Sequence, residues 1–263
     1  MQSALDISWL NLGVFSLTLL IPYGINKYYQ LNLTREFSIS LLRMAIQLVL
    51  VGLYLEFVFQ QNSLLLNIAW LSIMTIVGAS AIVSRAKLPR KFILPPVTVG
   101  LLVGLLPILI LLFTVIIKPE PVYSAQYLIP LSGMLLGNSL SGNIVALQNL
   151  FTAFEQRKGE YEAALSLGAS PSYAAAPFVR EAMQKALAPI LASMATTGIV
   201  TLPGMMTGQI LKGASPMLAI KYQIIILIAI FVMMSISLTL SLQLSLKRAI
   251  TKEGRILAKF LEK

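Results

Sequence analysis

The chain has 263 residues, of which 57% are hydrophobic and only 11% are charged. A soluble domain carries about 25% charged residues, so this composition excludes an ordinary soluble protein and indicates a bundle of membrane helices. The absence of cysteine and histidine excludes thiol catalysis, zinc sites built from these residues and histidine proton relays. The net charge of +10 does not indicate nucleic-acid binding, because the basic residues lie at the ends of apolar runs.

About seven apolar stretches reach the roughly 20 residues that a membrane-spanning helix needs. They cover residues 7–25, 37–59, 64–84, 93–117, 125–151, 187–211 and 217–246. The first stretch lacks the positive flank of a cleaved signal peptide, so we interpret it as a retained spanning helix. We therefore predict an all-α, polytopic membrane protein with about seven transmembrane helices.

The basic residues are concentrated in alternate connections between these stretches and in the C-terminal tail. They are Lys27, Arg35, Arg85, Lys87, Arg90, Lys91, Arg157, Lys158, Arg180, Lys185, Lys247, Arg248, Lys252, Arg255, Lys259 and Lys263. The other connections hold only Lys118, Lys212 and Lys221. The positive-inside rule then predicts that the N-terminus is outside and the C-terminus is in the cytosol.

Arg43 is the most expensive residue within the second stretch. It costs about 2.5–3.5 kcal/mol in a bilayer unless it is paired or lies near the interface. Gln47 follows four residues later on the same helical face. Two interpretations stay open. Arg43 extends to the cytosolic interface while Gln47 joins helices, or both residues line a transport path.

The fourth and fifth stretches carry small and polar residues at helical spacing. Gly100 and Gly104 form a small-xxx-small pattern that permits close helix approach. Asn138, Ser141 and Asn149 share one face of the fifth stretch. Because these side chains would be costly against lipid, that face meets either protein or water. Helix packing and the lining of a translocation path both fit this pattern.

A polar segment between the fifth and sixth stretches predicts a short, exposed helix. Alanine and leucine favour helix, Glu162 suits a first turn, and Gly168 with Pro171 ends the helix. The spacing resembles the E-A-A-x-x-x-G loop with which membrane subunits of ATP-binding-cassette (ABC) transporters dock onto their ATPase. That resemblance implies coupling roles for Glu162, Ala163, Ala164 and Gly168. Because the motif is short, an ordinary helix-turn is the alternative.

The sixth stretch contains Leu202-Pro203-Gly204, which we expect to break the helix within the bilayer. Freed carbonyl groups at that depth need partners in protein or water. Broken helices of this kind line transport sites or act as hinges, which makes Pro203, Gly204 and Gln209 candidates for the translocation path. A proline kink repaired by the neighbouring threonines is the alternative.

No glycine in the chain is followed by lysine, so a phosphate-binding P-loop is excluded. The chain is therefore expected to be a transport subunit rather than an enzyme. If transport is driven by ATP, hydrolysis takes place in a partner chain.

Three blocks together resemble the Fet-type (FetB-like) family of ABC iron-export permeases. They are Arg43-Met-Ala-Ile-Gln47, Gly133-Met-Leu-Leu-Gly-Asn138-Ser, and the long block from Leu202 to Pro216. Plant aluminium-tolerance ABC permeases are similar in the same blocks, and with the spans the resemblance covers nearly the whole chain. Where ABC importers continue with I-x-L-P, this sequence has Phe178-Val179-Arg180-Glu181, which weakens an importer interpretation.

The resemblance implies one ABC-type transmembrane domain over residues 1–263, with residues 155–185 as its cytosolic coupling loop. It also implies a permease homodimer in the bacterial inner membrane, driven by two copies of a cytosolic ATPase. The cargo would be iron or another metal-linked solute. No cofactor is expected, and no metal ligands can be named.

Two other classes of membrane protein remain as alternatives. A seven-helix receptor or sensor is favoured only by helix number and topology. A secondary transporter would be expected to carry an intramembrane carboxylate pair or a proton relay. A neighbouring gene for an ATP-binding protein would separate the exporter from both.

Overall fold

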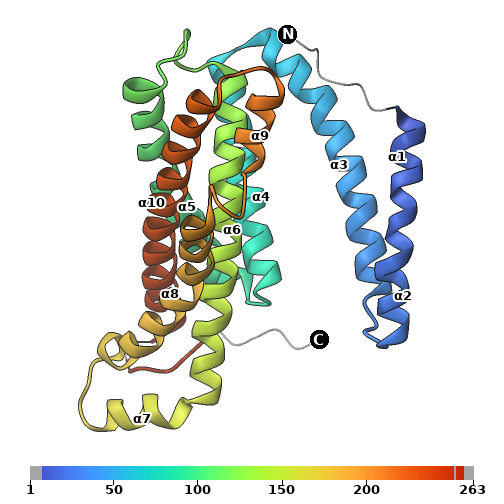
Figure 1. The fold of residues 1–263 in the computed structure, drawn as a ribbon. Helices are drawn as coiled ribbons and strands as arrows, with labels where there is room; N and C mark the ends of the chain where they lie inside the picture. The colour runs from blue at the N-terminus through green and yellow to red at the C-terminus, as the bar shows by residue number, and fades with distance from the viewer. Residues whose placement is uncertain (1–7, 252, 258–263) are drawn as a thin grey trace.

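A computed structural model of the chain describes residues 8–251 and 253–257. Its regular elements are all helical: α1 (Trp9–Ser16), η1 (Leu17–Leu19), α2 (Leu20–Tyr28), α3 (Thr34–Gln61), α4 (Leu64–Arg85), α5 (Arg90–Leu111), η2 (Leu112–Ile116), α6 (Ala125–Gln156), α7 (Lys158–Ser166), α8 (Pro171–Thr196), α9 (Gly204–Leu211) and α10 (Pro216–Ala249) (Figure 1). The predicted all-α architecture is confirmed.

Within the described ranges, six helical segments are long and apolar enough to cross a membrane. They are Trp9–Tyr28, Thr34–Gln61, Leu64–Arg85, Arg90–Ile116, Ala125–Gln156 and Pro216–Ala249. Each lies within a few residues of a predicted span, although the first prediction began at residue 7, outside the described residues. The remaining predicted span, 187–211, is not one helix, because α8 ends at Thr196 and α9 begins at Gly204.

The connections between the helices alternate between the two ends of the molecule. The α2–α3 and α4–α5 connections, the segment around α7 and the end of α10 lie at the lower end of Figure 1, and the α3–α4, η2–α6 and α9–α10 connections lie at the upper end. The basic connections thus gather at one end, while Lys252, Lys259 and Lys263 lie outside the described residues. The orientation of this end in a membrane stays a prediction.

Helices α5, α6 and α10 form the centre of the bundle, and α4 and α8 pack against α6. The expected close approach at Gly100 and Gly104 is confirmed. A methyl group on Gly100 would lie 2.9 Å from the backbone oxygen of Ser237 and would also collide with the hydroxyl of Ser241, both on α10. Asn143 of α6 is buried in the same region and donates a hydrogen bond to the Ser237 hydroxyl at 2.6 Å. Small side chains therefore bring these helices together.

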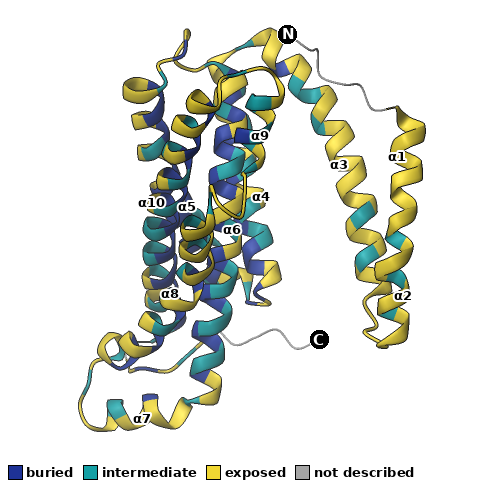
Figure 2. Cartoon of the chain, viewed as in Figure 1, coloured by how far each residue is buried: buried dark blue, intermediate teal, exposed yellow. Residues whose placement is uncertain are grey.

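The first three helices stand apart from the rest of the bundle (Figure 1). Only the end of α3 joins it: Val58 packs with Ala125 and Ile129, and the Tyr54 and Trp70 rings lie 4.3 Å apart between centroids. Elsewhere these helices are exposed along almost their whole length (Figure 2). Their surface is apolar, so lipid or another protein chain must cover it in a membrane.

The contact at Gly100 can be tested by adding one methyl group. Gly100→Ala should destabilise the protein by about 1–3 kcal/mol, because the added methyl group would lie only 2.9 Å from the backbone oxygen of Ser237, and backbone gives way less easily than a side-chain end. The matched control is Gly52→Ala in α3, where no atom lies within 4 Å of the added methyl group. The control should be neutral or stabilising, since alanine is the better helix former. Unfolding in mixed detergent micelles measures both, and equal effects would contradict the packing described.

Candidate functional site

Helix α7 lies across the end of α6, at the lower end of the bundle (Figure 1). It ends as the sequence predicts, because Gly168 adopts a left-handed φ of +89°. The amide of Ala169 donates to the carbonyl of Ala164 at 3.0 Å, and the amide of Gly168 donates to that of Leu165 at 2.9 Å. This pair of hydrogen bonds is a Schellman motif, which satisfies the last carbonyls of a helix.

Helix α8 begins three residues after this glycine. The Ser170 side chain caps it by accepting from the amide of Tyr173 at 3.3 Å, and Pro171 occupies the first helical turn. Two large side chains project from the corner between the helices: Leu167 is 89% exposed and Tyr173 is 76% exposed. Sequence reasoning missed both, although an apolar residue directly before a helix-ending glycine in a polar loop was a usable signal.

Glu162 does not lie in the first turn of α7, as the sequence had suggested. Because the helix begins at Lys158, Glu160 takes that place and Glu162 falls in the second turn. There Glu162 forms an ion pair with Lys158, with a nitrogen–oxygen distance of 3.2 Å. It also lines a cavity of about 660 Å³ between α7 and residues 253–256. Ala163 is exposed and Ala164 is half-buried.

Tyr161 anchors α7 to the rest of the protein. Its buried ring lies edge-on to Phe154 of α6, with centroids 5.2 Å apart, and Phe154 also contacts Phe178 of α8 at 5.2 Å. The Tyr161 hydroxyl donates to the carbonyl of Gly254 at 3.1 Å, and burial raises the pKa of this phenol. Helix α7 is therefore tied to α6, to α8 and to the segment that follows α10.

A network of charges surrounds the same junction. Arg157 donates from Nε to Glu160 at 2.9 Å and from Nη1 to Glu181 at 2.9 Å, and its guanidinium lies 4.8 Å from the centre of the Phe178 ring. Lys185 pairs with Glu181 at 2.7 Å. The hydrogen bond from Arg157 lowers the pKa of Glu160, and hydrogen bonds from Lys185 and then Arg157 lower the pKa of Glu181. Sequence reasoning counted Arg157 only as a topology marker.

Two of the predicted path residues come together between helices. Asn138 and Ser141 of α6 line a cavity of about 190 Å³ with Pro189 and Ser193 of α8. Met234 of α10 closes the cavity where Gly142 lacks a side chain. The cavity is thus lined by α6, α8 and α10. The contacts that anchor α7 involve α6, α8 and the segment after α10.

The other candidates on α6 and α9 lie outside this cavity. Asn149 is half-buried and donates to the carbonyl of Val145, in its own helix, at 2.8 Å. Gln209 belongs to α9, which packs against α10. Its Oε1 atom is buried and has no hydrogen-bond partner among the described residues. Arg43 and Gln47 line a separate cavity of about 310 Å³ between α3 and the end of α4.

The predicted break in the sixth stretch is confirmed, and residues 197–203 are not helical. Pro203 caps α9 in an extended conformation, and Gly204 is the first residue of that helix. Threonine hydroxyl groups satisfy some of the freed backbone carbonyls. The Thr197 hydroxyl donates to the carbonyl of Ser193 at 2.7 Å, and the Thr207 hydroxyl donates to the carbonyl of Pro203 at 2.9 Å. A hinge and a repaired kink both have this geometry.

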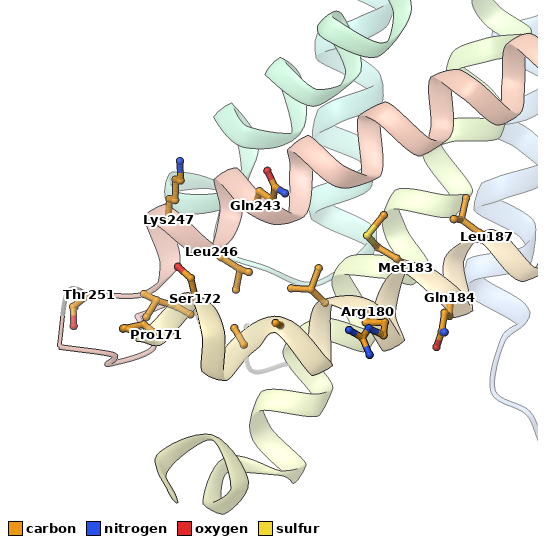
Figure 3. Close-up of a pocket in the computed structure, with 14 residues that line it drawn as sticks. Pro171, Ser172, Arg180, Met183, Gln184, Leu187, Gln243, Leu246, Lys247 and Thr251 are labelled. Carbon is orange, nitrogen blue, oxygen red and sulfur yellow. The ribbon is translucent and has the colours of Figure 1, made fainter. Parts of the chain in front are cut away.

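A larger groove of about 840 Å³ runs between α8 and α10, next to the α7–α8 corner (Figure 3). Met183, Leu187 and Leu246 supply apolar surface, while Arg180 and Lys247 bring positive charge from the two helices. Sequence reasoning did not single out this groove. In the part of the chain that the structure describes, no group of three or more carboxylate side chains is placed to hold a metal ion.

Comparison with known proteins identifies relatives along nearly the whole chain. The profile of Uncharacterised protein family UPF0014 matches residues 9–250. A UPF0014 membrane protein of Synechocystis is 33% identical over 229 residues, which cover 87% of this chain and 88% of the relative. Protein ALUMINUM SENSITIVE 3 of Arabidopsis thaliana is 33% identical over 82% of this chain and 76% of the relative.

A relative from Escherichia coli, named Probable iron export permease protein FetB, is 30% identical over 75% of this chain and 74% of the relative. No solved structure gives a significant match.

The Arg157 network makes the anchoring of α7 sensitive to acid. The pKa values of Glu160 and Glu181 lie below the ordinary 4.5 in the folded protein, so their contribution to stability is present above that value and is lost as the pH falls below it. Replacing both with glutamine should make the unfolding midpoint less dependent on pH between about pH 6 and about pH 3.5. Thermal unfolding across this range tests the prediction, and a profile identical to wild type would contradict it.

Proposed function

We propose that this chain, which belongs to the UPF0014 family of membrane proteins, is the permease subunit of an ABC exporter. The multi-pass membrane fold and relatives along most of the chain support this assignment. The names of the Escherichia coli and Arabidopsis relatives refer to iron export and to aluminium. We accordingly propose iron, or another metal-linked solute, as the cargo.

The observation that carries the proposal is the geometry of α7. It is a short helix that ends sharply at Gly168, exposes Glu162 and Ala163, and presents Leu167 at its end. These features suit a docking element for a separate ATPase in the cytosol. Exposed apolar side chains beside charged groups are typical of such contact surfaces.

Movement of the ATPase would reach the membrane helices through the anchors of α7. The Tyr161–Phe154 contact would transmit a movement of α7 to α6, and the Phe154–Phe178 contact would transmit it to α8. The Tyr161–Gly254 hydrogen bond would transmit it to the segment after α10. The cavity of Asn138 and Ser141 lies among these same helices. A change in their spacing would open or close that cavity. The Pro203–Gly204 break would let α8 move without dragging α10.

The remaining parts of the proposal concern assembly and location. Two permease copies would work with two ATPase copies, since ATP binding closes ATPase domains in pairs. The exposed helices α1–α3 would face lipid or the second copy. The end that holds α7 would lie in the cytosol of a bacterium, with the chain in its inner membrane, as the concentration of basic connections at that end favours.

Reversing the charge at the docking surface tests the proposal. Glu162→Arg should reduce the amount of ATPase that co-purifies with the permease at least about ten-fold, as loss of a charged interface contact does. Membrane insertion should be unchanged, because Glu162 is exposed. The control is Glu120→Arg, an exposed carboxylate in the η2–α6 connection, which lies at the end of the molecule opposite α7 and should leave the complex intact. Equal recovery of ATPase with both variants would remove the docking role.

Cysteine substitution tests the path, in a chain that has no cysteine of its own. Asn138→Cys should react with water-soluble thiol reagents in at least one nucleotide state of the complex, because its side chain lines a cavity. Asn149→Cys and Gln209→Cys extend the test to the other candidates. Gln61→Cys, at the exposed end of α3 and away from the docking surface, is the positive control. If only the control is labelled, the polar face of α6 is helix packing and not a path.

A further inference from the structure

The cavity between α3 and the end of α4 is lined by cationic and polar side chains next to apolar ones. Its volume is about 310 Å³, and its walls are Ser40, Arg43, Met44, Gln47, Leu48, Val51 and Arg85. Two of these side chains are guanidinium cations, one is an amide and one is a hydroxyl. None of the lining residues is acidic. The cavity therefore offers hydrogen-bond donors with a net positive charge.

Neither arginine forms an ion pair with a carboxylate among the residues that the structure describes. The ion pairs found among the described residues all lie around α7 and α8, and none includes Arg43 or Arg85. Glu36 lies two turns from Arg43 on the same face of α3, but it is not part of the cavity wall. Two like charges that face one cavity at the edge of a bilayer repel each other, and a bound anion would relieve that repulsion.

The donors come from two helices, α3 and α4. Ser40, Arg43 and Gln47 follow one another at helical spacing along α3, so they form one polar face. Arg85 is the last residue of α4. The Gln148 side chain of α6 donates to the Arg85 carbonyl at 3.0 Å, which holds the backbone at this helix end. A planar guanidinium presents paired N–H donors that match the two oxygens of a carboxylate or phosphate.

The rest of the wall is apolar. Met44 and Leu48 lie beside Arg43 and Gln47 along α3, and Val51 lies one turn beyond Gln47. A ligand with a charged oxyanion end and a less polar body would match both parts of the wall. Because the lower part of α3 makes no other side-chain contact with the bundle core, such a ligand would also fasten the α1–α3 unit to α4.

We propose that this cavity binds an oxyanion, a phosphate or carboxylate group held between Arg43 and Arg85 with help from Gln47 and Ser40. The group has two possible sources: the headgroup of an anionic lipid, or a water-soluble anion such as a metal chelate. The proposal concerns the binding chemistry of the chain itself and stands whether or not an ATPase partner is found.

The test uses the full chain in two settings. In nanodiscs of phosphatidylcholine, isothermal titration calorimetry measures the affinity for inorganic pyrophosphate. In detergent, native mass spectrometry measures how much phosphatidylglycerol stays bound. Arg43→Gln and Arg85→Gln should each weaken binding of the true ligand about ten-fold or more, as expected for loss of a charge-assisted hydrogen bond. Arg35→Gln, at the start of the same helix and outside the cavity wall, has the same charge change and should leave binding unaltered.

Each outcome decides the proposal. Arginine-dependent binding of pyrophosphate supports a water-soluble anion, and arginine-dependent retention of phosphatidylglycerol alone supports a lipid headgroup. If neither probe depends on Arg43 and Arg85, or if Arg35→Gln weakens binding equally, the proposal is wrong. Arg43→Lys and Arg85→Lys guard against misfolding, because they keep the charge but lose the paired donors. They should fold as wild type and bind more weakly.

Discussion

The position of α7 depends on the contacts that the buried Tyr161 side chain makes with α6 and with the segment after α10. A short helix outside the membrane gains little stability from its own hydrogen bonds, because nucleating so few turns is costly. Helix α7 is held in place by tertiary contacts instead: the aromatic contacts with Phe154 and the hydrogen bond to Gly254. Gly254 adopts a left-handed φ of +88° and packs directly on Leu165, so a larger residue would push the segment away from α7. In the proposed coupling role, a movement of α7 would pass through these contacts into α6, α8 and the segment after α10.

Inside the bundle, a different constraint governs the packing. Lipid gives apolar helices no strong reason to associate, so close contact relies on small residues and on hydrogen bonds between helices. Gly100 and Gly104 meet the serine-rich face of α10, and Asn143 bridges to Ser237. These contacts hold α5, α6 and α10 together. Helix α8 differs, because it ends in the non-helical segment 197–203. Under the proposed function, movement of α8 at this break would change the access to the cavity that α6, α8 and α10 share.

Much of the fold could be predicted from the sequence because the bilayer imposes a simple rule of length and polarity. Spans such as 64–84 and 125–151 were placed within a few residues of α4 and the apolar part of α6. The stretch 187–211 consists of two helices, and its interruption at Leu202-Pro203-Gly204 could be predicted because proline and glycine break helices. The end of α8 at Thr196, before that break, could not be predicted from hydropathy. The end of α7 at Gly168 was predictable because a left-handed C-cap strongly favours glycine.

The candidate sites were harder to predict, because they depend on which helices become neighbours. Helical spacing placed Asn138 and Ser141 on one face, but only the fold shows that α8 and Met234 complete their cavity. Arg85, which the sequence marked only as a loop charge, lines the same cavity as Arg43. Leu167 and Tyr173 were overlooked since single exposed apolar residues are common on any protein surface.

The most direct test of the central claim is transport by purified components. The permease is reconstituted into liposomes, with and without a candidate ATPase from the same organism, and iron uptake into the lumen is followed after iron and ATP are added outside, to molecules whose α7 end faces outward. The account predicts uptake that needs both chains and ATP, together with faster ATP hydrolysis when the permease is present. Iron movement by the permease alone, driven by an ion gradient and indifferent to every ATPase tested, would contradict it and would identify the chain as a secondary transporter.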